Sequence, residues 1–511
     1  MSPLPGRLES HWIDTTPPTS YPPLDGDRSV DVVVVGGGIA GVSTAWELAR
    51  AGRTVAIVEA DRVVTGVTGY TTAKLTAQHT MIYAQIRKTF GAEAAGSYAT
   101  SQQQAVEHVQ ATATELGIDC ELERVPAFTY AESEDMAQNL RDEADAAAEA
   151  GLPATFVTVT GLPFQVAGAV RVADQAQFHP RKYLLGLLDD LTRLGGQVFE
   201  HSRVVQLHEG DPNTVVTEHG ARITAHDVVV ATHYPVFDRA LMFTRLEPVR
   251  EVVVAAVIPQ GDDPLGTYIT PEHNTRSVRT APYADGQRLL IVTGEHFSPG
   301  TGNGLAQFER LLSWTTQTFP RAEVVARWAT QDVSTPDKVP YIGSFYPGAR
   351  NVYVATGFGG WGMSNGVLAG QLLRDLVTGA GSPWAKLYDP RRLKPLTEAG
   401  PVLKQQAKTA RHFIGDRLTS NVDSIDKIGP GQGAVTRLDG ERCAVYRDPD
   451  GALQAVSATC THLGCIVAFN EAETAWECPC HGSRFAVDGS VLQGPATRPL
   501  QRREIAVTRE A

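Results

Sequence analysis

The sequence predicts an α/β domain, an α+β part inserted into that domain, and a small all-β domain near the C-terminus. Residues 31–60, DVVVVGGGIAGVSTAWELARAGRTVAIVEA, read as a buried strand, a glycine turn, a helix and a second buried strand, which together make one βαβ unit. Further along, short strand patterns alternate with Asp-Gly turns in RDPDGALQ and FAVDGSVLQ, as an all-β domain requires. A chain of 511 residues has room for several domains of ordinary size.

The composition is that of a globular protein, with 42% hydrophobic and 20% charged residues. The formal net charge of -12 argues against nucleic acid or an anionic membrane as the main partner, because both need a basic protein face. No uncharged apolar run reaches the roughly 18 residues of a membrane span, and the first residues are polar and Pro-rich. We therefore expect a cytoplasmic protein without an integral membrane span.

The glycines of the βαβ unit form the pattern G-x-G-x-x-G at Gly36, Gly38 and Gly41. The first glycine makes the tight turn, the second lets a pyrophosphate approach, and the third allows the helix to pack on the strand. Glu59 ends the second strand, where its carboxylate can accept hydrogen bonds from the ribose hydroxyls of an adenosine. A glycine-rich turn without a ligand is the alternative, but strand, helix and terminal acid in this order predict a bound dinucleotide, either NAD or FAD.

The rest of the chain favours FAD. Residues 62–79, RVVTGVTGYTTAKLTAQH, form a Gly- and Thr-rich loop that can wrap a second phosphate and a ribityl chain, with Thr71, Thr72 and Lys74 as candidate contacts. Far downstream, residues 349–377 repeat the pattern of strand, glycine turn and helix. A cofactor fold that opens near the N-terminus and closes only near residue 377 resembles the FAD-dependent D-amino-acid oxidase and glycine or sarcosine oxidase family, over roughly residues 30–395.

Three intermediate stretches match this family in order, namely residues 177–207, 227–235 and 335–343. The resemblance implies that the backbone near Val204 faces the adenine. It also implies that the second glycine turn lies beside the isoalloxazine ring, with the positive end of the following helix near the electron-rich edge of that ring. The residues implied there are Gly357, Gly359, Gly360, Gly362 and Met363.

The resemblance also divides the first part of the chain. Residues 1–30 are expected to form an N-terminal arm, and residues 31–395 the FAD-dependent oxidoreductase. The FAD-binding, Rossmann-like parts are expected at about 31–79, 166–235 and 331–395, and the substrate domain at about 80–165 and 236–330. Within the substrate domain the first segment has a helical pattern and the second alternates as strands, which predicts an α+β fold.

Five of the six cysteines lie between Cys443 and Cys480, so they serve one local structure. Cys460 and His462 are spaced C-x-H, whereas Cys478 and His481 are spaced C-x-x-H. Zinc is one interpretation, because it accepts two cysteines and two histidines. However, each loop offers one cysteine and one histidine, which suits a centre where two cysteines hold one iron and two histidines the other.

The boxes CTHLGC and CPCHGS, at residues 460–465 and 478–483, resemble a Rieske [2Fe-2S] domain of the cytochrome bc1 type. By this resemblance the cluster ligands are Cys460, His462, Cys478 and His481, Cys465 and Cys480 form a disulfide, and residues 494–496, GPA, cover the cluster. The domain is expected at 423–511, after a linker helix at 396–422 with a basic amphipathic pattern. Phe485 stands where a tyrosine is often found, and the loss of that hydroxyl should lower the cluster potential.

Four polar or aromatic residues are candidates for catalysis beside the flavin: Arg279, His296, Lys338 and Trp361. Arg279 and His296 fall in or beside predicted strands of the substrate domain, and Arg279 can hold a carboxylate if the substrate has one. An ordinary structural role is the alternative for each of the four. His79, which ends the loop at 62–79, is placed for covalent attachment of a flavin by its position alone.

The resemblance implies an enzyme that oxidises the C–N bond of an amine or amino acid, with FAD and a Rieske [2Fe-2S] cluster as cofactors. FAD accepts two electrons and the cluster accepts one, so the fusion predicts two successive one-electron transfers to an external acceptor. That would make the protein a dehydrogenase. In one alternative, a reduced carrier feeds the cluster and the flavin reduces its substrate. In another, the Rieske domain senses redox state or gates the binding of a partner.

Overall fold

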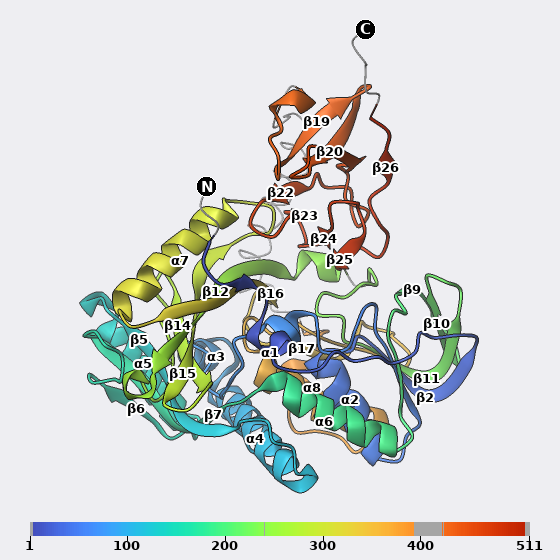
Figure 1. Ribbon diagram of the computed structural model, residues 1–511. Helices are drawn as coiled ribbons and strands as arrows, with labels where there is room; N and C mark the ends of the chain where they lie inside the picture. The colour runs from blue at the N-terminus through green and yellow to red at the C-terminus, as the bar shows by residue number, and fades with distance from the viewer. Residues whose placement is uncertain (1–3, 240, 393–421, 423, 506–511) are drawn as a thin grey trace. The chain divides into compact units, whose positions relative to one another are not determined.

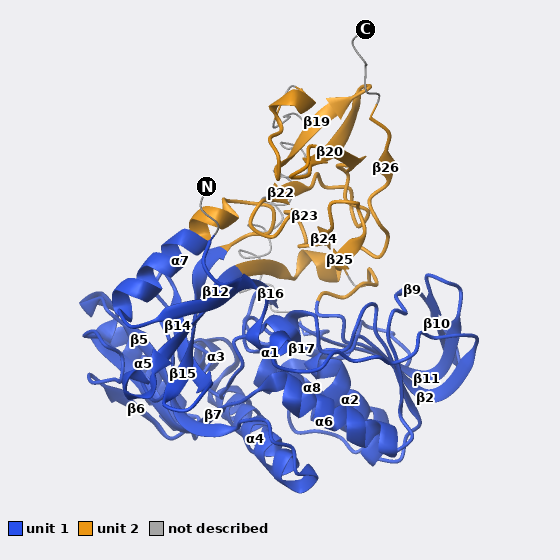
Figure 2. Cartoon of the chain, viewed as in Figure 1, with its two compact units in different colours: residues 1–233, 251–296, 308–393 blue, residues 234–250, 297–307, 394–511 orange. Residues whose placement is uncertain are grey.

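The computed structural model describes residues 4–239, 241–392, 422 and 424–505. The chain divides into two compact units (Figure 2). Unit 1 comprises Met1–His233, Glu251–His296 and Phe308–Leu393, and unit 2 comprises Tyr234–Arg250, Phe297–Gln307 and Lys394–Ala511. The linker helix predicted at 396–422 lies outside the described residues, apart from Val422. Within the described part of the chain, no helix is both long enough and apolar enough to cross a membrane.

Unit 1 contains a mostly parallel sheet that begins with the predicted βαβ unit (Figure 1). Its strand order is β17-β18-β11-β2-β3-β8, and all neighbours from β18 to β8 are parallel. The strands are β2 Arg28–Val35, β3 Val55–Val58, β8 Gln197–Phe199, β11 Arg222–Val230, β17 Tyr341–Ser344 and β18 Val352–Thr356. In addition, β10 Asn213–Thr217 pairs with β11, and β9 Val204–His208 pairs with β10. Val32, Val33 and Val34 are fully buried, as expected of a parallel strand that is covered on both faces.

Three helices pack beside this sheet, α2 Ile39–Arg50, α6 Pro180–Arg193 and α8 Gly362–Thr378. Helices α2 and α8 lie side by side (Figure 1). Their contact needs glycine, because a Cβ at Gly366 would lie 2.6 Å from Cγ2 of Ile39 and one at Gly370 would lie 2.8 Å from Cβ of Ser43. Both helices begin just after the carboxyl ends of parallel strands, which is the edge where open α/β sheets bind ligands.

A second sheet of unit 1, ten-stranded over the described residues, carries the α+β part. Its order is β1-β16-β12-β15-β14-β13-β5-β7-β4, with β6 paired to β7. The strands are β1 Arg7–Leu8, β4 Lys74–Leu75, β5 Glu123–Ala131, β6 Ala154–Val157, β7 Gly168–Gln177, β12 Glu247–Pro259, β13 Thr267–Ile269, β14 Arg276–Pro282, β15 Gln287–Phe297 and β16 Glu323–Ser334. The other α-helices among the described residues are α1 His11–Asp14, α3 Tyr83–Phe90, α4 Ala92–Leu116, α5 Ala137–Glu149, α7 Gly304–Thr318 and α9 Ala385–Tyr388. This mixture of helices and strands confirms the predicted α+β class.

Unit 2 contains two four-stranded antiparallel sheets, which confirm the predicted all-β class. They are β19 Gly433–Leu438, β20 Glu441–Arg447, β21 Leu453–Ser457 and β26 Arg502–Arg503, and β22 Ala468–Asn470, β23 Ala475–Glu477, β24 Arg484–Phe485 and β25 Val491–Gln493. Two segments from the middle of the chain, 234–250 and 297–307, belong to this unit as well (Figure 2). Unit 2 is therefore not built from C-terminal residues alone.

Candidate functional site

The first glycine turn follows β2 and leads into α2. Gly36 has a left-handed φ of +106°, and a Cβ there would lie 2.5 Å from the carbonyl oxygen of Ala231. A Cβ at Gly41 would lie 1.9 Å from the carbonyl oxygen of Gly36, so no side chain fits at either position. Gly38 is the N-cap of α2 and brings no side chain of its own to the helix N-terminus. Such a terminus suits the pyrophosphate of a dinucleotide.

Glu59 follows β3 and binds the same turn. Its Oε2 accepts a hydrogen bond from the N–H of Gly37 (2.7 Å), and burial raises the pKa of the carboxyl group. The N–H of Ser202 donates to the carbonyl oxygen of Glu59 (2.8 Å), so the segment that leads to Val204 reaches the same end of the sheet. The residues predicted for the adenosine half of the cofactor are thus gathered in one place.

The Gly- and Thr-rich loop ends in β4 against the larger sheet. The indole N–H of Trp12 donates to the carbonyl oxygen of Thr71 (2.6 Å). The Nζ of Lys74 donates to Oγ1 of Thr72 (3.1 Å) and to Oγ of Ser277 on β14. Burial lowers the pKa of Lys74 to about 8. A buried lysine that titrates near neutral pH is a candidate acid–base group.

The second glycine turn follows β18. Gly357, Gly359 and Gly360 have left-handed φ values of +77°, +58° and +90°, a conformation that favours glycine. Oδ2 of Asp332 accepts a hydrogen bond from the N–H of Gly360 (2.6 Å). Helix α8 then begins at Gly362, followed by Met363, which is buried. The predicted flavin turn therefore has the shape of a backbone cradle at a second helix N-terminus.

Trp361, the N-cap of α8, stacks on the imidazole of His79, with ring centroids 4.6 Å apart and planes inclined by 17°. Nδ1 of His79 lies 2.6 Å from the hydroxyl of Tyr98, and Nε2 lies 2.8 Å from the carbonyl oxygen of Thr76. Burial lowers the pKa of His79 to about 3. Because both ring nitrogens have partners in the protein, the geometry argues against His79 as an attachment point for a flavin.

Arg279 on β14 is 1% exposed and bonds to the backbone of the protein. Its Nη1 donates to the carbonyl oxygens of Ala73 (2.6 Å) and Thr72 (3.2 Å), and its Nε donates to that of Thr280 (3.0 Å). Burial lowers the pKa of the guanidinium to about 9. Arg279 thus holds the loop at 62–79 onto the sheet, and its role as a carboxylate clamp stays a prediction.

His296 at the end of β15 pairs with Glu251 on β12. Although burial opposes it, the Glu251 carboxylate raises the pKa of His296. The same carboxylate acts electrostatically on Lys74, and the charge of the exposed Lys338 acts on His296. The charge of Arg279 acts on Lys74 as well, so three of the predicted catalytic residues belong to one electrostatic group with Lys74. Glu251, which joins this group, was missed because REVVVAAVIP reads only as a strand.

These residues fit FAD. The first glycine turn has no room for side chains, the second favours glycine by its left-handed backbone, and each lies before a helix N-terminus. Glu59 stands at the adenosine end. The first turn and Glu59 would hold the adenosine and pyrophosphate, and the second turn would lie beside the isoalloxazine ring.

Two loops of unit 2 share one hydrogen-bond pattern. In the first, the N–H of Cys460 donates to the carbonyl oxygen of Cys465 (2.8 Å), and the glycine four residues after Cys460 donates back to its carbonyl (3.0 Å). In the second, the N–H of Cys478 donates to the carbonyl oxygen of Ser483 (2.8 Å), and the glycine four residues after Cys478 donates back (3.0 Å). The same loop conformation therefore presents each Cys and His pair.

The four predicted cluster ligands meet between these loops. The rings of His462 and His481 lie 4.9 Å apart at 89°, and a hydrogen bond from Cys478 lowers the pKa of Cys460. Burial lowers the pKa of His462 to about 4 and that of His481 to about 3, so both imidazoles are neutral, the form that binds metal. The Nδ1 atoms of both histidines are buried without a hydrogen-bond partner. Such orphaned atoms are rare, and here they fit two ligand nitrogens of a Rieske cluster.

Cys465 and Cys480 form a disulfide with their Cα atoms 6.5 Å apart, which is the pairing implied by the Rieske resemblance. The Sγ of Cys478 lies within 4.8 Å of both sulfurs. Oγ of Ser483 accepts a hydrogen bond from the N–H of Ala496 (3.0 Å), which belongs to the GPA loop, and a hydrogen bond from Ser483 lowers the pKa of Cys460. The crosslink and this hydroxyl thus tie the two ligand loops and the covering loop together.

Two aromatic residues from the segment 234–250 lie against the histidines. The ring of Tyr234 is 6.4 Å from that of His462 and 6.1 Å from that of His481, and the ring of Phe243 is 5.8 Å from that of His481. Sequence reasoning missed both residues. The only signal is an aromatic residue in HYP, directly after the strand pattern DVVVAT.

A buried ion network in unit 2 was missed as well. Arg250 pairs with Glu473 (2.6 Å) and with Glu477, the residue before Cys478. Oε2 of Glu477 also accepts a hydrogen bond from the N–H of Gly300 (2.9 Å). Although burial opposes it, Arg250 and a second arginine, Arg484, lower the pKa of Glu473 to about 2. The network thus binds both inserted segments to β23, the strand that ends just before the predicted ligand Cys478.

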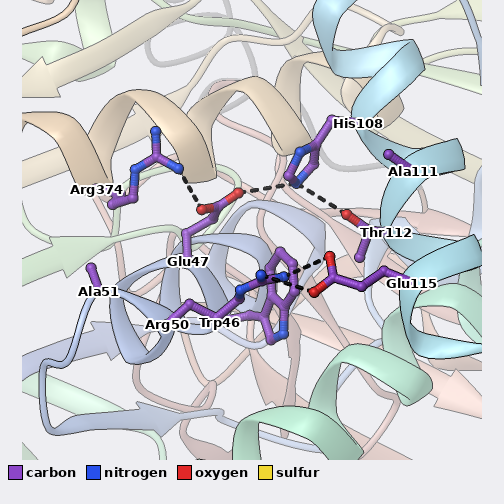
Figure 3. A pocket seen from close by; sticks show the side chains of 9 residues that line it. All are labelled: Trp46, Glu47, Arg50, Ala51, His108, Ala111, Thr112, Glu115 and Arg374. Carbon is purple, nitrogen blue, oxygen red and sulfur yellow. Dashed lines mark hydrogen bonds and ion pairs between the residues drawn. The ribbon is translucent and has the colours of Figure 1, made fainter.

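Residues of α2, α4 and α8 line a pocket in unit 1 (Figure 3). Glu47 pairs there with Arg374 (2.7 Å) and His108 (3.0 Å), and Arg50 pairs with Glu115 (2.9 Å). These residues stand near the C-terminal ends of α2 and α8, whereas the glycine turns precede their N-termini. The charged groups of the pocket pair with one another, and none of them belongs to the residues predicted to bind a cofactor.

The family comparisons agree with this geometry. The family model described as FAD dependent oxidoreductase matches residues 31–376, and the model described as Rieske [2Fe-2S] domain matches residues 420–504. The chain therefore belongs to the FAD dependent oxidoreductase family and carries a C-terminal Rieske domain. Its cofactors are FAD and a [2Fe-2S] cluster, as the sequence predicted.

Individual relatives share parts or all of this organisation. The chain is 33% identical over 495 residues to the putative Rieske 2Fe-2S iron-sulfur protein YhfW of Bacillus subtilis, and the aligned part covers 97% of each chain. It is 25% identical over 376 residues to gamma-glutamylputrescine oxidoreductase of Escherichia coli, covering 70% of this chain and 85% of the relative. The structure of glycine oxidase from Geobacillus kaustophilus matches with a TM-score of 0.61 at 22% identity, covering 72% of this chain and all of that one, which shows the shared fold.

Proposed function

We propose that the protein oxidises the C–N bond of an amine or amino acid with FAD and passes the electrons through the Rieske cluster to an external one-electron acceptor. The observation that carries this proposal is a pair of consecutive residues. His233 is bonded to the second glycine turn of unit 1, and Tyr234 packs on the cluster histidines of unit 2. One peptide bond therefore joins the contacts of the two cofactor sites.

His233 is held at the flavin turn by two contacts. Its carbonyl oxygen accepts a hydrogen bond from Oγ1 of Thr356 (2.5 Å), the residue before Gly357. Its Nε2 lies 3.4 Å from Oδ1 of Asp332, whose other oxygen binds the N–H of Gly360. The left-handed φ of His233, +64°, is a conformation that non-glycine residues keep only where their surroundings impose it. This anchoring supports an electron path that leaves the flavin turn along the chain.

When bound, FAD would take up the hydride of the C–H bond next to the amine nitrogen as the C–N bond becomes an imine, and the cluster would supply a carrier for one electron at a time. The side chains prepare the substrate for this step. An amine must be neutral to lose hydride, so a group that accepts the proton of its ammonium form is needed. Lys74 supports this role, because burial lowers its pKa to about 8 and the hydroxyls of Thr72 and Ser277 orient its Nζ.

Glu251 and His296 complete the proposed substrate side. Their side chains are 29% and 40% exposed. The pair can therefore contact a substrate although both residues belong to strands of the sheet. A carboxylate at this place suits a cationic amine, which it attracts and binds by a charge-assisted hydrogen bond. The relative from Escherichia coli, an oxidoreductase of gamma-glutamylputrescine, supports an amine as the substrate class.

The test is anaerobic stopped-flow absorbance of the holoprotein mixed with a panel of amines and amino acids. We expect one class of compound to bleach the flavin, followed by fading of the Rieske bands at an equal or slower rate. Bleaching of the flavin while a reducible cluster stays oxidised would contradict the proposal and favour the gating interpretation. Cluster reduction that precedes flavin reduction, with a reduced carrier as donor, would instead reverse the direction of electron flow.

Cys460→Ser is the matched control, because it removes a cluster ligand and leaves both glycine turns intact. The variant should retain substrate-driven flavin bleaching and lose the fast reduction of added cytochrome c. Undiminished cytochrome c reduction by this variant would show that electrons leave the flavin without the cluster.

A further inference from the structure

We propose that Tyr234 is a positioning residue for the Rieske cluster, which holds both ligand imidazoles in the orientation that the cluster requires. Its value for catalysis rests on the proposed function. The positioning itself concerns only the cluster, so it can fail while the dehydrogenase activity holds, and the reverse is also true. No ligand motif of the Rieske domain contains Tyr234, which comes from the chain that follows β11.

Four rings meet at the cluster site, those of two aromatic residues and of the two histidines. Tyr234 meets His462 at 74° and His481 at 70°, Phe243 meets His481 at 89°, and the two imidazoles meet each other at 89°. All four contacts are edge-to-face, with centroids between 4.9 and 6.4 Å apart, within the range in which aromatic rings attract one another. Tyr234 is the residue that touches both imidazoles in this set of contacts.

The phenol ring of Tyr234 is itself held in place. Tyr234 is 2% exposed, and its hydroxyl donates to the carbonyl oxygen of Phe243 (3.2 Å). Phe237 and Met242, between these two residues, are buried as well. The hydroxyl bond therefore links Tyr234 to Phe243, and the rings of these two residues contact the histidines together. A ring held at both its hydroxyl and its edge can transmit a definite orientation to its neighbours.

Segment 234–250 is attached near both of its ends to residues around the cluster site. Near its start, Cγ1 of Val236 lies 3.5 Å from the place of a Cβ on Gly494, at the head of the GPA loop. At its other end, Arg250 is buried against Glu477, which precedes the ligand Cys478. Tyr234 is thus part of a segment that contacts the ligand loops and the covering loop, and not an isolated side chain that fills a gap.

The function of such an attachment follows from the chemistry of the ligands. Partners beyond the metal fix the plane of a metal-binding imidazole, and loss of a hydrogen-bonded partner typically weakens metal binding or activity by about 10–100-fold. Tyr234 acts on His462 and His481 at once by edge-to-face ring packing instead of a hydrogen bond, so the lower end of that range is the expected size. Since their Nδ1 atoms are the orphaned ligand atoms, rotation of either ring would misdirect a ligand.

The experiment compares Tyr234→Leu with Tyr446→Leu in the full-length holoprotein. Tyr446 is a matched control, because it is also buried in unit 2 and its ring contact is with Phe469, at 5.6 Å. The readouts are the electron paramagnetic resonance spectrum of the dithionite-reduced cluster and the rate of iron loss to a chelator, neither of which needs a substrate or the flavin. Tyr234→Leu should shift the g-values, broaden the lines of the spectrum and release iron about 10-fold faster. Tyr446→Leu should keep the wild-type spectrum.

Two further variants keep the proposal falsifiable. Tyr234→Phe retains the ring and should restore g-values close to those of the wild type. Tyr234→Trp keeps the site filled with an aromatic ring of another shape, so it should alter the spectrum even if Tyr234→Leu takes up no cluster. A wild-type spectrum in Tyr234→Trp, or an equal change in Tyr446→Leu, would overturn the positioning role.

Discussion

Replacing Arg250 with methionine should destabilise unit 2 by several kcal/mol. The buried guanidinium pairs with Glu473 and Glu477, so its removal leaves two buried carboxylates with Arg484 as the remaining arginine of the network. Breaking a buried ion pair by removing one partner typically costs about 3–5 kcal/mol. Methionine fills much of the space of the arginine stem, so the loss reports the charge more than a cavity.

The pKa of Glu473 gives the pH dependence. The arginines hold it well below its ordinary value of 4.5, although burial opposes them. Because the pKa is depressed in the folded state, this stabilisation is present above the unfolded pKa near 4.5 and is lost as the pH falls toward 2. The difference in stability between the wild type and Arg250→Met should therefore shrink in acid.

The assay is the thermal loss of the visible circular dichroism of the cluster in the holoprotein. One kcal/mol shifts the midpoint of a small domain by about 4–8 °C, so Arg250→Met should lower it by roughly 12 °C or more. Arg502→Met is the matched control, because Arg502 is 79% exposed in its pair with Asp488 and such pairs contribute at most about 1 kcal/mol. If both variants lower the midpoint equally, the buried network does not hold unit 2 together and the reasoning is wrong.

Three further predictions concern the other sites. Gly41→Ala should abolish FAD binding, measured as flavin absorbance of the purified protein, because the new Cβ would lie 1.9 Å from a backbone oxygen; Gly96→Ala in α4, with its nearest atom at 3.9 Å, should bind FAD normally. Cys465→Ser opens a crosslink over a sequence separation of 15 and should lower the stability of unit 2 by about 3 kcal/mol, so an unchanged midpoint of cluster loss would contradict it. The pKa of Lys74 is lowered from 10.5 to about 8, so the unfolded chain binds more protons between these values. Wild-type stability should accordingly rise with pH across this window, by about 3 kcal/mol relative to Lys74→Met, and parallel unfolding curves would refute the burial of its charge.

The sequence predicts a cofactor site well where the residues of that site are local. The first glycine turn and Glu59 lie within one βαβ unit, and each cluster loop carries its Cys and His within four residues, so the spacing itself encodes the geometry. The contact between Arg250 and Glu477 joins residues 227 positions apart. No periodicity in either strand distinguishes these two residues from ordinary charged side chains, because a pairing across that separation is set by the tertiary fold.

Arg279 is a second residue whose contacts could not be predicted from the local sequence. A single arginine in a predicted strand of the substrate domain suggested a carboxylate clamp. In the structure its Nε and Nη1 donate to backbone carbonyls of the loop that precedes β4 and of its own strand. Carbonyl oxygens leave no trace in the sequence, since every residue has one. Such an arginine can therefore be assigned to loop anchoring only after the fold is known.

Unit 2 contains two segments that lie outside the residues matched by the Rieske model. The Rieske model matches residues 420–504, yet Tyr234 packs on both ligand histidines and Arg250 neutralises the carboxylate beside Cys478. A fragment restricted to residues 423–511 would lack both side chains, and its buried glutamates would lose one of their two arginines, at a cost of order 3–5 kcal/mol. Side chains from outside the matched Rieske residues thus line the predicted cluster site. A change at the end of β11 can accordingly reach the cluster histidines through covalent structure, because Tyr234 follows that strand by four residues.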